Sequence, residues 1–524
     1  MKARGLALAL LAPACVLAWA HWWHPAMLDD AFITFRYARN WATGEGLTFN
    51  AGAPPVEGYT NFLWLAIAAV GLKCGLDPVM LMPLVGVACA LATLFVLGRA
   101  THGLVSDVSP VVKSLPALLV GVNPLFAMWA VSGMETPLVT LCVAGGVCSV
   151  AARRGQAHWT AALWFLAAVF TRPDAMLWAL VMGLCCLRTD ARRALVQFAL
   201  PFALAFGAYW IWRWMTFDAF WPNTFHAKQG GSPALFLMGC SAVAWGLLRH
   251  LPFAMSLMCA LILIDYARKH RPSVHAVRGT AVPWITGAVF VHLLYVVWSG
   301  GDAFAGDRLL MPALPAMALL LALCTHLSAE SRLGRQDGIS VAVLVLLAAL
   351  LPLREAVKAA DETRVAQWRW TCAGEWLGRH LPAGTRVALN PIGAIGYHAP
   401  DLFIIDMLGL TDAVIAREPV REAEQWLKPG HRKGSAARVL ALAPDVILIN
   451  NVWLHPGWMM GWTPLYRSES ELFAMREELL QRFEMFNRPV PEEEWPETLP
   501  SDHVPEGVET LWIGGLKRQG MALR

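Results

Sequence analysis

Apolar stretches of roughly 15–22 residues recur from the N-terminus to about Leu353, and each has the length that a helix needs to cross a bilayer. Hydrophobic residues make up 57% of the chain and charged residues only 15%, a composition that soluble proteins do not have. The sequence therefore predicts a polytopic α-helical membrane protein. We interpret the first apolar run, Gly5–Ala20, as an uncleaved anchor and not a signal peptide, because no polar secreted domain follows it directly.

About eleven membrane-spanning helices are predicted, and the positive-inside rule orients them. With Lys2 and Arg4 in the cytoplasm, 15 of the 23 Lys and Arg residues before Leu353 fall in inner loops. Two further apolar segments, 60–76 and 234–249, would break the alternation, so we assign them to the outer surface as interfacial or re-entrant helices. The predicted spans are 5–22, 78–98, 112–127, 135–152, 157–171, 174–188, 194–215, 251–267, 281–298, 309–327 and 338–353.

The chain changes character beyond Leu353, where 23 of its 38 acidic residues lie. We therefore divide it into a transmembrane domain, 1–353, and a soluble α/β domain, 354–524. An odd number of spans puts this second domain on the periplasmic side of a bacterial inner membrane. Helices are expected at 362–380 and, amphipathic, at 468–488. Short apolar runs predict buried strands at 385–390, 402–407 and 445–450.

Composition also excludes some partners and cofactors. The net charge of +4, without a run of Lys or Arg, does not indicate nucleic-acid binding. The 11 cysteines lie mostly in apolar segments and show no zinc or haem spacing.

Polar residues collect in the loops that this layout places outside. Nearly every charge falls at the end of a predicted helix, whereas transport favours charges at mid-membrane depth, so the pattern indicates chemistry at the membrane surface. The segments are Asp29–Tyr37 with Glu57–Thr60, Ser132–Thr136, Thr171–Asp174, Pro222–Lys228 and Gly300–Arg308.

Asp29 and Asp30 place two carboxylates side by side just beyond the first membrane helix. Such a pair can accept a proton, bind a divalent cation such as Mg, Mn or Ca, or cap the helix expected at 31–42. Capping would explain one of the two residues but not both. A metal bound by Asp29 and Asp30 remains open at this stage.

Four cations in the outer segments are candidates for binding a phosphate, because their charge and hydrogen-bond donors suit an anion and the planar fork of Arg can hold two oxygens. The competing interpretation places them at the lipid headgroups, and Arg36 equally suits a structural pair with a carboxylate. These cations are Arg36, Arg172, Lys228 and Arg308.

Taken in order, the outer segments resemble the signature segments of GT-C-fold membrane glycosyltransferases, in particular the group that contains the terminal β-arabinofuranosyltransferases of the mycobacterial cell wall. The resemblance continues at Gly393–Tyr397, Asp406–Asp412 and Pro444–Leu448, so it covers nearly the whole chain. One departure is Gly430–Gly434, which is more basic than the family pattern leads us to expect; this bears on the identity of the acceptor.

The resemblance implies a GT-C-like fold and a polyprenyl-phosphate sugar donor. The sugar, arabinofuranose or a related one, would pass to a cell-envelope glycan or glycoconjugate on the outer face, with membrane lipids around the helices. It also implies that Asp29 or Asp30 is the base, with a slight preference for Asp29, and in some families such residues are metal ligands. The four cations selected above on their chemistry would then bind the donor phosphate.

Other polar residues are candidates for binding sugar or acceptor hydroxyls, or a cation. For the four acidic ones, salt bridges to the Arg residues are the rival interpretation, and His226 favours structural hydrogen bonding because no second His stands at ligand spacing. The candidates are Glu57, Tyr59, Glu135, Asn223, His226, Asp302 and Asp307. A multi-pass lipid or glycolipid transporter or flippase is the alternative function, and a non-catalytic scaffold is a third.

Overall fold

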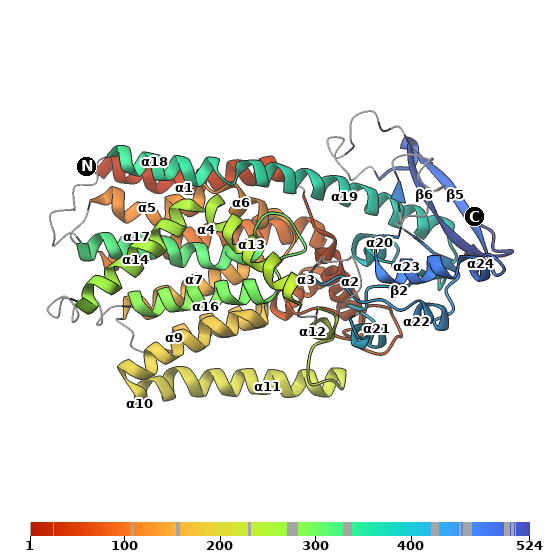
Figure 1. Cartoon of the computed structure of the whole chain (residues 1–524), viewed down its shortest axis with the longest axis horizontal. Coiled ribbons are helices and arrows are strands. Elements are labelled where there is room, and N and C mark those ends of the chain that lie inside the picture. The colour runs from red at the N-terminus through yellow and green to blue at the C-terminus, as the bar shows by residue number, and fades with distance from the viewer. Residues whose placement is uncertain are drawn as a thin grey trace.

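The computed structural model contains a long helical bundle at one end and a mixed sheet flanked by helices at the other (Figure 1). It describes residues 2–24, 26–105, 109–153, 158–228, 232–269, 281–328, 338–420, 429–449, 452–453, 464–496, 504, 508 and 510–523. Several basic residues that oriented the predicted spans lie outside the described residues. They belong to the predicted inner loops at 154–157, 270–280 and 329–337.

Every predicted span coincides with a helix or a bent pair of helices. The bundle consists of α1 (Lys2–Trp23), α4 (Pro78–Leu104), α5 (Pro110–Gly121), α6 (Pro124–Val131), α7 (Thr136–Ala152), α8 (Trp159–Thr171), α9 (Met176–Thr189), α10 (Ala191–Ala194), α11 (Leu200–Phe217), α13 (Pro233–Arg249), α14 (Leu251–Lys269), α16 (Val282–Trp298), α17 (Leu314–Ser328) and α18 (Gly338–Leu350).

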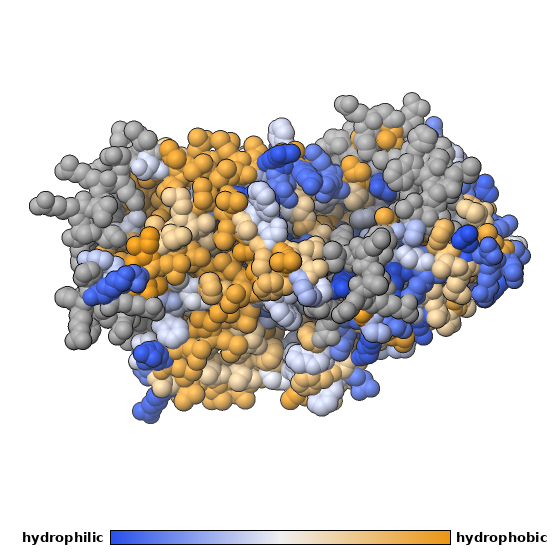
Figure 2. All heavy atoms as spheres, viewed as in Figure 1, coloured by the Kyte–Doolittle hydropathy of each residue, from blue (hydrophilic) through white to orange (hydrophobic). Residues whose placement is uncertain are grey.

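Length and composition identify four helices of the described chain as able to cross a membrane, or six if each bent pair is one span. Several further apolar helices are shorter, so a multi-pass membrane protein is established, while the count of eleven crossings stays a prediction. On the face seen in Figure 2, hydrophobic residues cover the bundle and hydrophilic residues gather over the other end. A bundle with an apolar outer surface is what a lipid environment requires.

Two bent pairs of helices occur in the described part of the bundle. Between α5 and α6 the axis turns by 53°, because the Asn123 side chain accepts hydrogen bonds from the amides of Leu125 and Phe126, and Pro124 occupies the first position of the new helix. Helices α13 and α14 meet at 99°. A bend of this size occurs both in broken spans and in re-entrant segments, so the surface helix expected at 234–249 stays a prediction.

The outer ends of the bundle carry short helices that build the cavity described below. They are α2 (Asp29–Thr43), α3 (Phe62–Lys73), α12 (Asn223–Lys228) and the 3-10 turns η1 (Pro173–Ala175) and η3 (Arg308–Ala313). The polar segments singled out in the sequence therefore gather at one end of the bundle, beside the C-terminal domain (Figure 1).

Helix α19 (Leu353–His380) continues α18 into the C-terminal domain, so residues 340–380 form one helical stretch of 41 residues. The division that we drew at residue 353 thus falls within continuous helix. The first part is apolar and the second amphipathic, with Ala356, Trp368 and Trp376 among its buried residues. Pro352 stands before the first turn of α19, where its missing N–H costs no hydrogen bond.

The C-terminal domain has a six-stranded sheet with the order β2-β1-β3-β6-β4 and with β5 paired to β6. Strands β1, β2 and β3 are parallel and coincide with the three predicted strands; the strands that pair with β6 are antiparallel to it. The strands are β1 (Arg386–Leu389), β2 (Phe403–Asp406), β3 (Val446–Ile447), β4 (Val452–Trp453), β5 (Phe483–Pro491) and β6 (Thr510–Arg518). The helices are α20 (Ile392–His398), α21 (Ala413–Arg417), α22 (Ala436–Ala441), α23 (Arg467–Ala474) and α24 (Arg476–Leu479), and η5 (Glu492–Glu494) is a 3-10 turn.

One predicted helix is partly wrong. Residues 468–488 were expected to form a single amphipathic helix, but helical structure ends at Leu479 and β5 begins at Phe483. Nine residues of β5 pair with β6 along its full length, and this long antiparallel ladder decides the local structure.

Candidate active site

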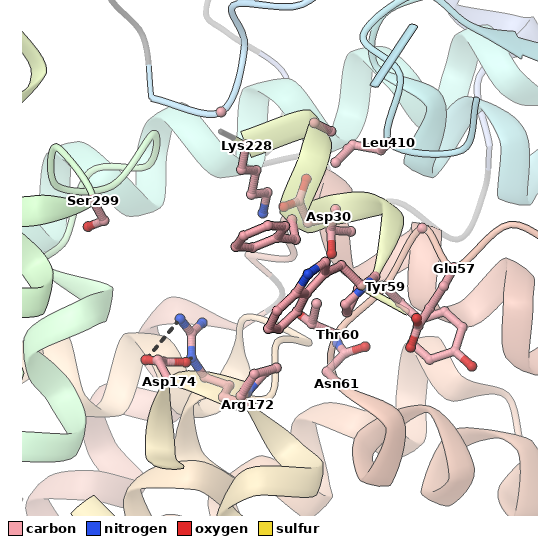
Figure 3. Close-up of a pocket in the computed structure, with 18 of the residues that line it drawn as sticks. Asp30, Glu57, Tyr59, Thr60, Asn61, Arg172, Asp174, Lys228, Ser299 and Leu410 are labelled. Carbon is pink, nitrogen blue, oxygen red and sulfur yellow. Dashed lines mark hydrogen bonds and ion pairs between the residues drawn. The ribbon is translucent and has the colours of Figure 1, made fainter. Parts of the chain in front are cut away.

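A cavity of about 1350 Å³ lies between the outer ends of the membrane helices and the C-terminal domain. Asp30, Glu57, Arg172 and Lys228 surround the same space in Figure 3. The lining comes from α2, the loop before α3, η1, α11, α12, η3 and, on the opposite side, residues 410, 420 and 429–433 of the C-terminal domain. Both parts of the molecule are therefore needed to form it.

The two adjacent aspartates have different surroundings. The Asp29 carboxylate accepts hydrogen bonds from the amides of Gly393 and Ala394, at 3.0 and 2.7 Å, where α20 begins. It does not line the cavity. Burial raises the pKa of Asp29 to about 7, against the opposing effect of these amides.

Asp30 lines the cavity and forms no hydrogen bond or ion pair with a described residue. Its carboxylate lies in the first turn of α2, at the positive end of the helix dipole. Its charge is close enough to Arg308 to act on that residue. The geometry thus favours Asp30 as the reactive carboxylate, contrary to our slight preference for Asp29.

Arg172 lies in the cavity wall between two carboxylates. Its Nη1 is 3.0 Å from Glu135 Oε1 and its Nε is 2.9 Å from Asp174 Oδ1, the pair drawn as a dashed line in Figure 3. Asn61 donates a hydrogen bond of 3.1 Å to the other oxygen of Glu135. Arg172 and Glu135 therefore form one buried network on the membrane side of the cavity.

Arg308 and Asp302 form a second pair in the same wall. The Nε of Arg308 is 2.7 Å from Asp302 Oδ2, and its Nη2 is 3.0 Å from Oδ1. Only 8% of the Arg308 side chain is exposed. The pair uses two of the five N–H groups of the guanidinium and leaves others for an anion in the cavity.

Glu57 is bound by Arg213, a residue that the sequence analysis did not select. Arg213 Nη2 is 2.6 Å from Glu57 Oε2, and both side chains are almost fully buried. Arg213 lies near the end of a predicted span, where a single cation among apolar residues gave the only signal. Tyr59 lines the cavity beside this pair, and its buried hydroxyl has no hydrogen-bond partner among the described residues.

Lys228 ends α12, and its side chain points into the cavity (Figure 3). It has no ion pair with a described residue. A methyl group at Gly430 would lie 3.4 Å from Lys228 Cγ, so the lysine passes close to the C-terminal domain. Among the four candidate phosphate-binding cations, Lys228 is the one whose charge is not already compensated by a carboxylate or a set of carbonyls.

Arg36 is not in the cavity. Its guanidinium donates to the backbone carbonyls of Phe49 at 2.7 Å and Leu402 at 2.9 Å, and also to that of Gly396. It is 2% exposed. Arg36 therefore holds the first outer loop against the C-terminal domain, and its prediction as a phosphate ligand finds no support in the geometry.

Asn223, His226 and Asp307 also lie outside the cavity lining. Asn223 donates to the carbonyls of Gly409 and Leu410 at 2.9 and 2.8 Å, which joins α12 to the C-terminal domain. Burial, with the nearby Arg417 and Lys433, lowers the pKa of His226. Asp307 pairs with Arg249.

The Asp307–Arg249 contact is a double one, with Nε–Oδ2 of 2.7 Å and Nη2–Oδ1 of 2.5 Å. Burial opposes ionisation of Asp307, but hydrogen bonds from His250 and Arg249 outweigh it and lower the pKa of Asp307 to about 2. This residue stabilises the turn before η3 and does not face the site.

The loop Asp406–Asp412 shapes the side of the cavity that belongs to the C-terminal domain. The Asp406 carboxylate accepts from the amides of Leu408, Gly409 and Thr411, at 2.8, 3.1 and 2.7 Å. This closed loop presents the two carbonyls that Asn223 binds and places Leu410 in the lining.

Possible cation ligands are sparse. Within the described ranges, no group of three or more His, Cys, Asp and Glu side chains is arranged to hold a metal ion. The Asp29 carboxylate is held by the amides of Gly393 and Ala394, whereas Asp30 lines the cavity, so the two adjacent carboxylates have separate surroundings.

The fold is that of ArnT-like GT-C proteins. The structure of ArnT from Cupriavidus metallidurans bound to undecaprenyl phosphate matches with a TM-score of 0.54 and 13% identity, over 98% of this chain and 97% of that one. The apo structure of the same protein gives a TM-score of 0.54 and 13% identity, over 78% and 87%. At this identity the likeness establishes the fold.

A sequence relative points in the same direction. The terminal β-(1→2)-arabinofuranosyltransferase of Corynebacterium glutamicum is 28% identical over 350 residues, covering 58% of this chain. The chain spans about half (49%) of the length of that relative. Residues 358–489 match the model of a family described as Domain of unknown function (DUF8728). The chain thus resembles GT-C glycosyltransferases of the arabinofuranosyltransferase group.

Proposed function

We propose that this protein is a glycosyltransferase that moves a sugar from a polyprenyl-phosphate donor to a cell-envelope glycan on the periplasmic face of the inner membrane. The observation that carries the proposal is the cavity at the ends of the membrane helices. Its lining holds both Asp30 and Lys228, neither of which forms an ion pair with a described residue. The C. glutamicum relative supports arabinofuranose or a related sugar.

The reaction needs a base and a site for the departing phosphate. Asp30 takes the proton from an acceptor hydroxyl as its oxygen attacks the anomeric carbon. The bond from that carbon to the phosphate oxygen breaks, and the electron pair leaves with polyprenyl phosphate. Lys228, with the free N–H groups of Arg308, stabilises the charge that develops there. A single displacement inverts the anomeric configuration without a covalent enzyme intermediate.

The donor's lipid chain needs an apolar path into the cavity. Helix α11 supplies Phe206 and Ile211 to the lining, and the side chain of Ile211 is 58% exposed on the bundle surface. Only 11% of the apolar window of this helix is buried. A chain lying along α11 would remain in the membrane while its phosphate reached Lys228.

A transfer assay tests the proposal. Purified protein in detergent would be supplied with polyprenyl-phosphate arabinose and total envelope glycan, with and without EDTA. Sugar incorporation that is lost in Asp30→Asn is the expected result. Full activity of Asp30→Asn would rule out the assigned base, and loss of activity with EDTA would show that a divalent cation is required. Donor binding without transfer in any envelope fraction would favour the transporter alternative.

A further inference from the structure

The charges that line the cavity are segregated between its two sides. The membrane side carries five carboxylates against four cations, namely Asp30, Glu57, Glu135, Asp174 and Asp302 against Arg172, Arg213, Arg308 and Lys228. All three arginines are in ion pairs. The other side has Arg432 and Lys433, and no carboxylate among the described residues that line it. We call residues 429–433 the basic wall.

Lys433 is buried in this wall, and no carboxylate of a described residue forms an ion pair with it. Only 6% of this residue is exposed, and its ammonium group donates a hydrogen bond to the carbonyl of Glu418. Burial lowers the pKa of Lys433, and the neighbouring Arg467 and Arg432 lower it further, while Glu418 opposes them. An ammonium group crowded by other cations is stabilised by an anion.

The basic wall belongs to the C-terminal domain and lines the cavity opposite the ends of the membrane helices. A polyprenyl-phosphate donor is held by its chain at the membrane surface, where α11 and α12 meet the cavity. An acceptor glycan must enter from the other direction, past residues 429–433. The charge and the position of the basic wall therefore suit contact with the acceptor.

We propose that the basic wall binds an anionic group of the acceptor, a phosphate or a carboxylate, so that the enzyme selects acidic envelope glycans. This inference rests on the proposed function, since it names the substrate class of the same cavity. It also accounts for the departure of Gly430–Gly434 from the family pattern, because a neutral arabinan would not need buried cations there.

Equilibrium binding tests the proposal without knowledge of the natural acceptor. Glucose 6-phosphate, glucuronate and glucose would be titrated into the detergent-purified full chain, first alone and then with saturating undecaprenyl phosphate. We expect both acidic sugars to bind at least tenfold more tightly than glucose, in both conditions. Equal binding of the three sugars would overturn the proposal, and displacement of the acidic sugars by undecaprenyl phosphate would assign the basic wall to the donor instead.

Variants give the matched controls. Lys433→Met should weaken binding of glucose 6-phosphate at least tenfold, Lys433→Arg should retain it, and Lys269→Met, at the opposite end of the bundle, should leave it unchanged. Unchanged binding in Lys433→Met would contradict the proposal. Undecaprenyl phosphate is titrated separately. Its failure to bind would count against the proposed function, whereas the binding of glucose 6-phosphate tests the basic wall independently.

Discussion

The polar residues of the outer loops divide between two regions, the cavity and the domain interface. In the cavity, Asp30 and Lys228 have no ion pair within the described part of the chain, and Arg308 keeps N–H groups that Asp302 does not use. At the domain interface, α2, the loop after it and α12 contact residues 393–411. There, Asp29, Arg36 and Asn223 each form hydrogen bonds with backbone groups. Residues of the same type, even adjacent ones, thus serve chemistry in one region and assembly in the other.

The largest effect is expected for Asp30→Asn, which tests the catalytic role proposed for the cavity. Removing a general base costs roughly 10²–10⁴-fold in rate, and we expect a loss of about 1,000-fold in kcat. The dissociation constant of undecaprenyl phosphate should change less than about threefold, because the amide occupies the same volume. Single-turnover transfer and lipid binding are the two measurements. Substantial remaining turnover would move the base to another residue.

Asp29→Asn examines the neighbouring residue at the domain interface. The pKa of Asp29 is about 7 in the folded protein, against about 3.9 when unfolded. The folded state then holds the proton more tightly, so this group's contribution to stability is fully present below about pH 4 and is lost as the pH rises through 7.

Between pH 4 and pH 7 the free energy of unfolding would fall by about 4 kcal/mol at most through this group. Thermal unfolding in detergent at pH 5 and pH 8 should therefore show a smaller drop in Tm for Asp29→Asn than for the wild type. An identical pH dependence in the two proteins would mean that the Asp29 pKa is not raised by folding. Transfer activity should fall much less than in Asp30→Asn.

Lys228→Met sharpens the assignment of the phosphate site. Loss of one stabilising donor typically costs roughly 10²–10³-fold, and we expect about a 100-fold fall in kcat/KM for the donor, with Lys228→Arg retaining most of the activity. Arg36→Lys, at the domain interface, is the contrasting variant. It should lower Tm without a specific effect on the donor. A selective donor defect in Arg36→Lys would contradict the division between the two regions.

The smallest effect is expected for Gly58→Ala. A methyl group there would lie 2.7 Å from the Tyr37 hydroxyl and 2.8 Å from Thr411 Cγ2, so the first outer loop would have to move away from the C-terminal domain. Overpacking of this kind costs about 1–3 kcal/mol. Gly98→Ala meets no atom within 4 Å and serves as the control. Equal Tm values for the two variants would show that the contact is loose.

Sequence predicted the secondary structure well where periodicity and capping decide it. The long apolar runs predicted the helices of the bundle, and the short apolar runs bounded by turn residues predicted β1, β2 and β3. Strand β5 was missed because its buried residues, Phe483, Phe486 and Val490, are spaced like those of a helix. Only its pairing with β6, a segment beyond it in the chain, determines the strand.

The candidate site was predicted as a set of segments but not as a set of roles. Asp29 and Asp30 could not be told apart in sequence, since the amides that bind Asp29 are 364 and 365 residues away. Arg36 was likewise indistinguishable from Arg172 until its carbonyl partners were known. Long-range backbone contacts of this kind leave no local pattern.

The helical stretch at 340–380 fixes the height of the C-terminal domain. At 1.5 Å per residue, 41 residues extend about 60 Å, roughly twice the thickness of the hydrocarbon layer. Under the proposed function, the part of this helix beyond the membrane would hold the C-terminal domain, with its basic wall, at a set distance from the lipid surface, while the donor phosphate would stay at that surface. The rate of transfer would then depend on bilayer thickness, because a thinner or thicker membrane would shift the donor relative to the acceptor.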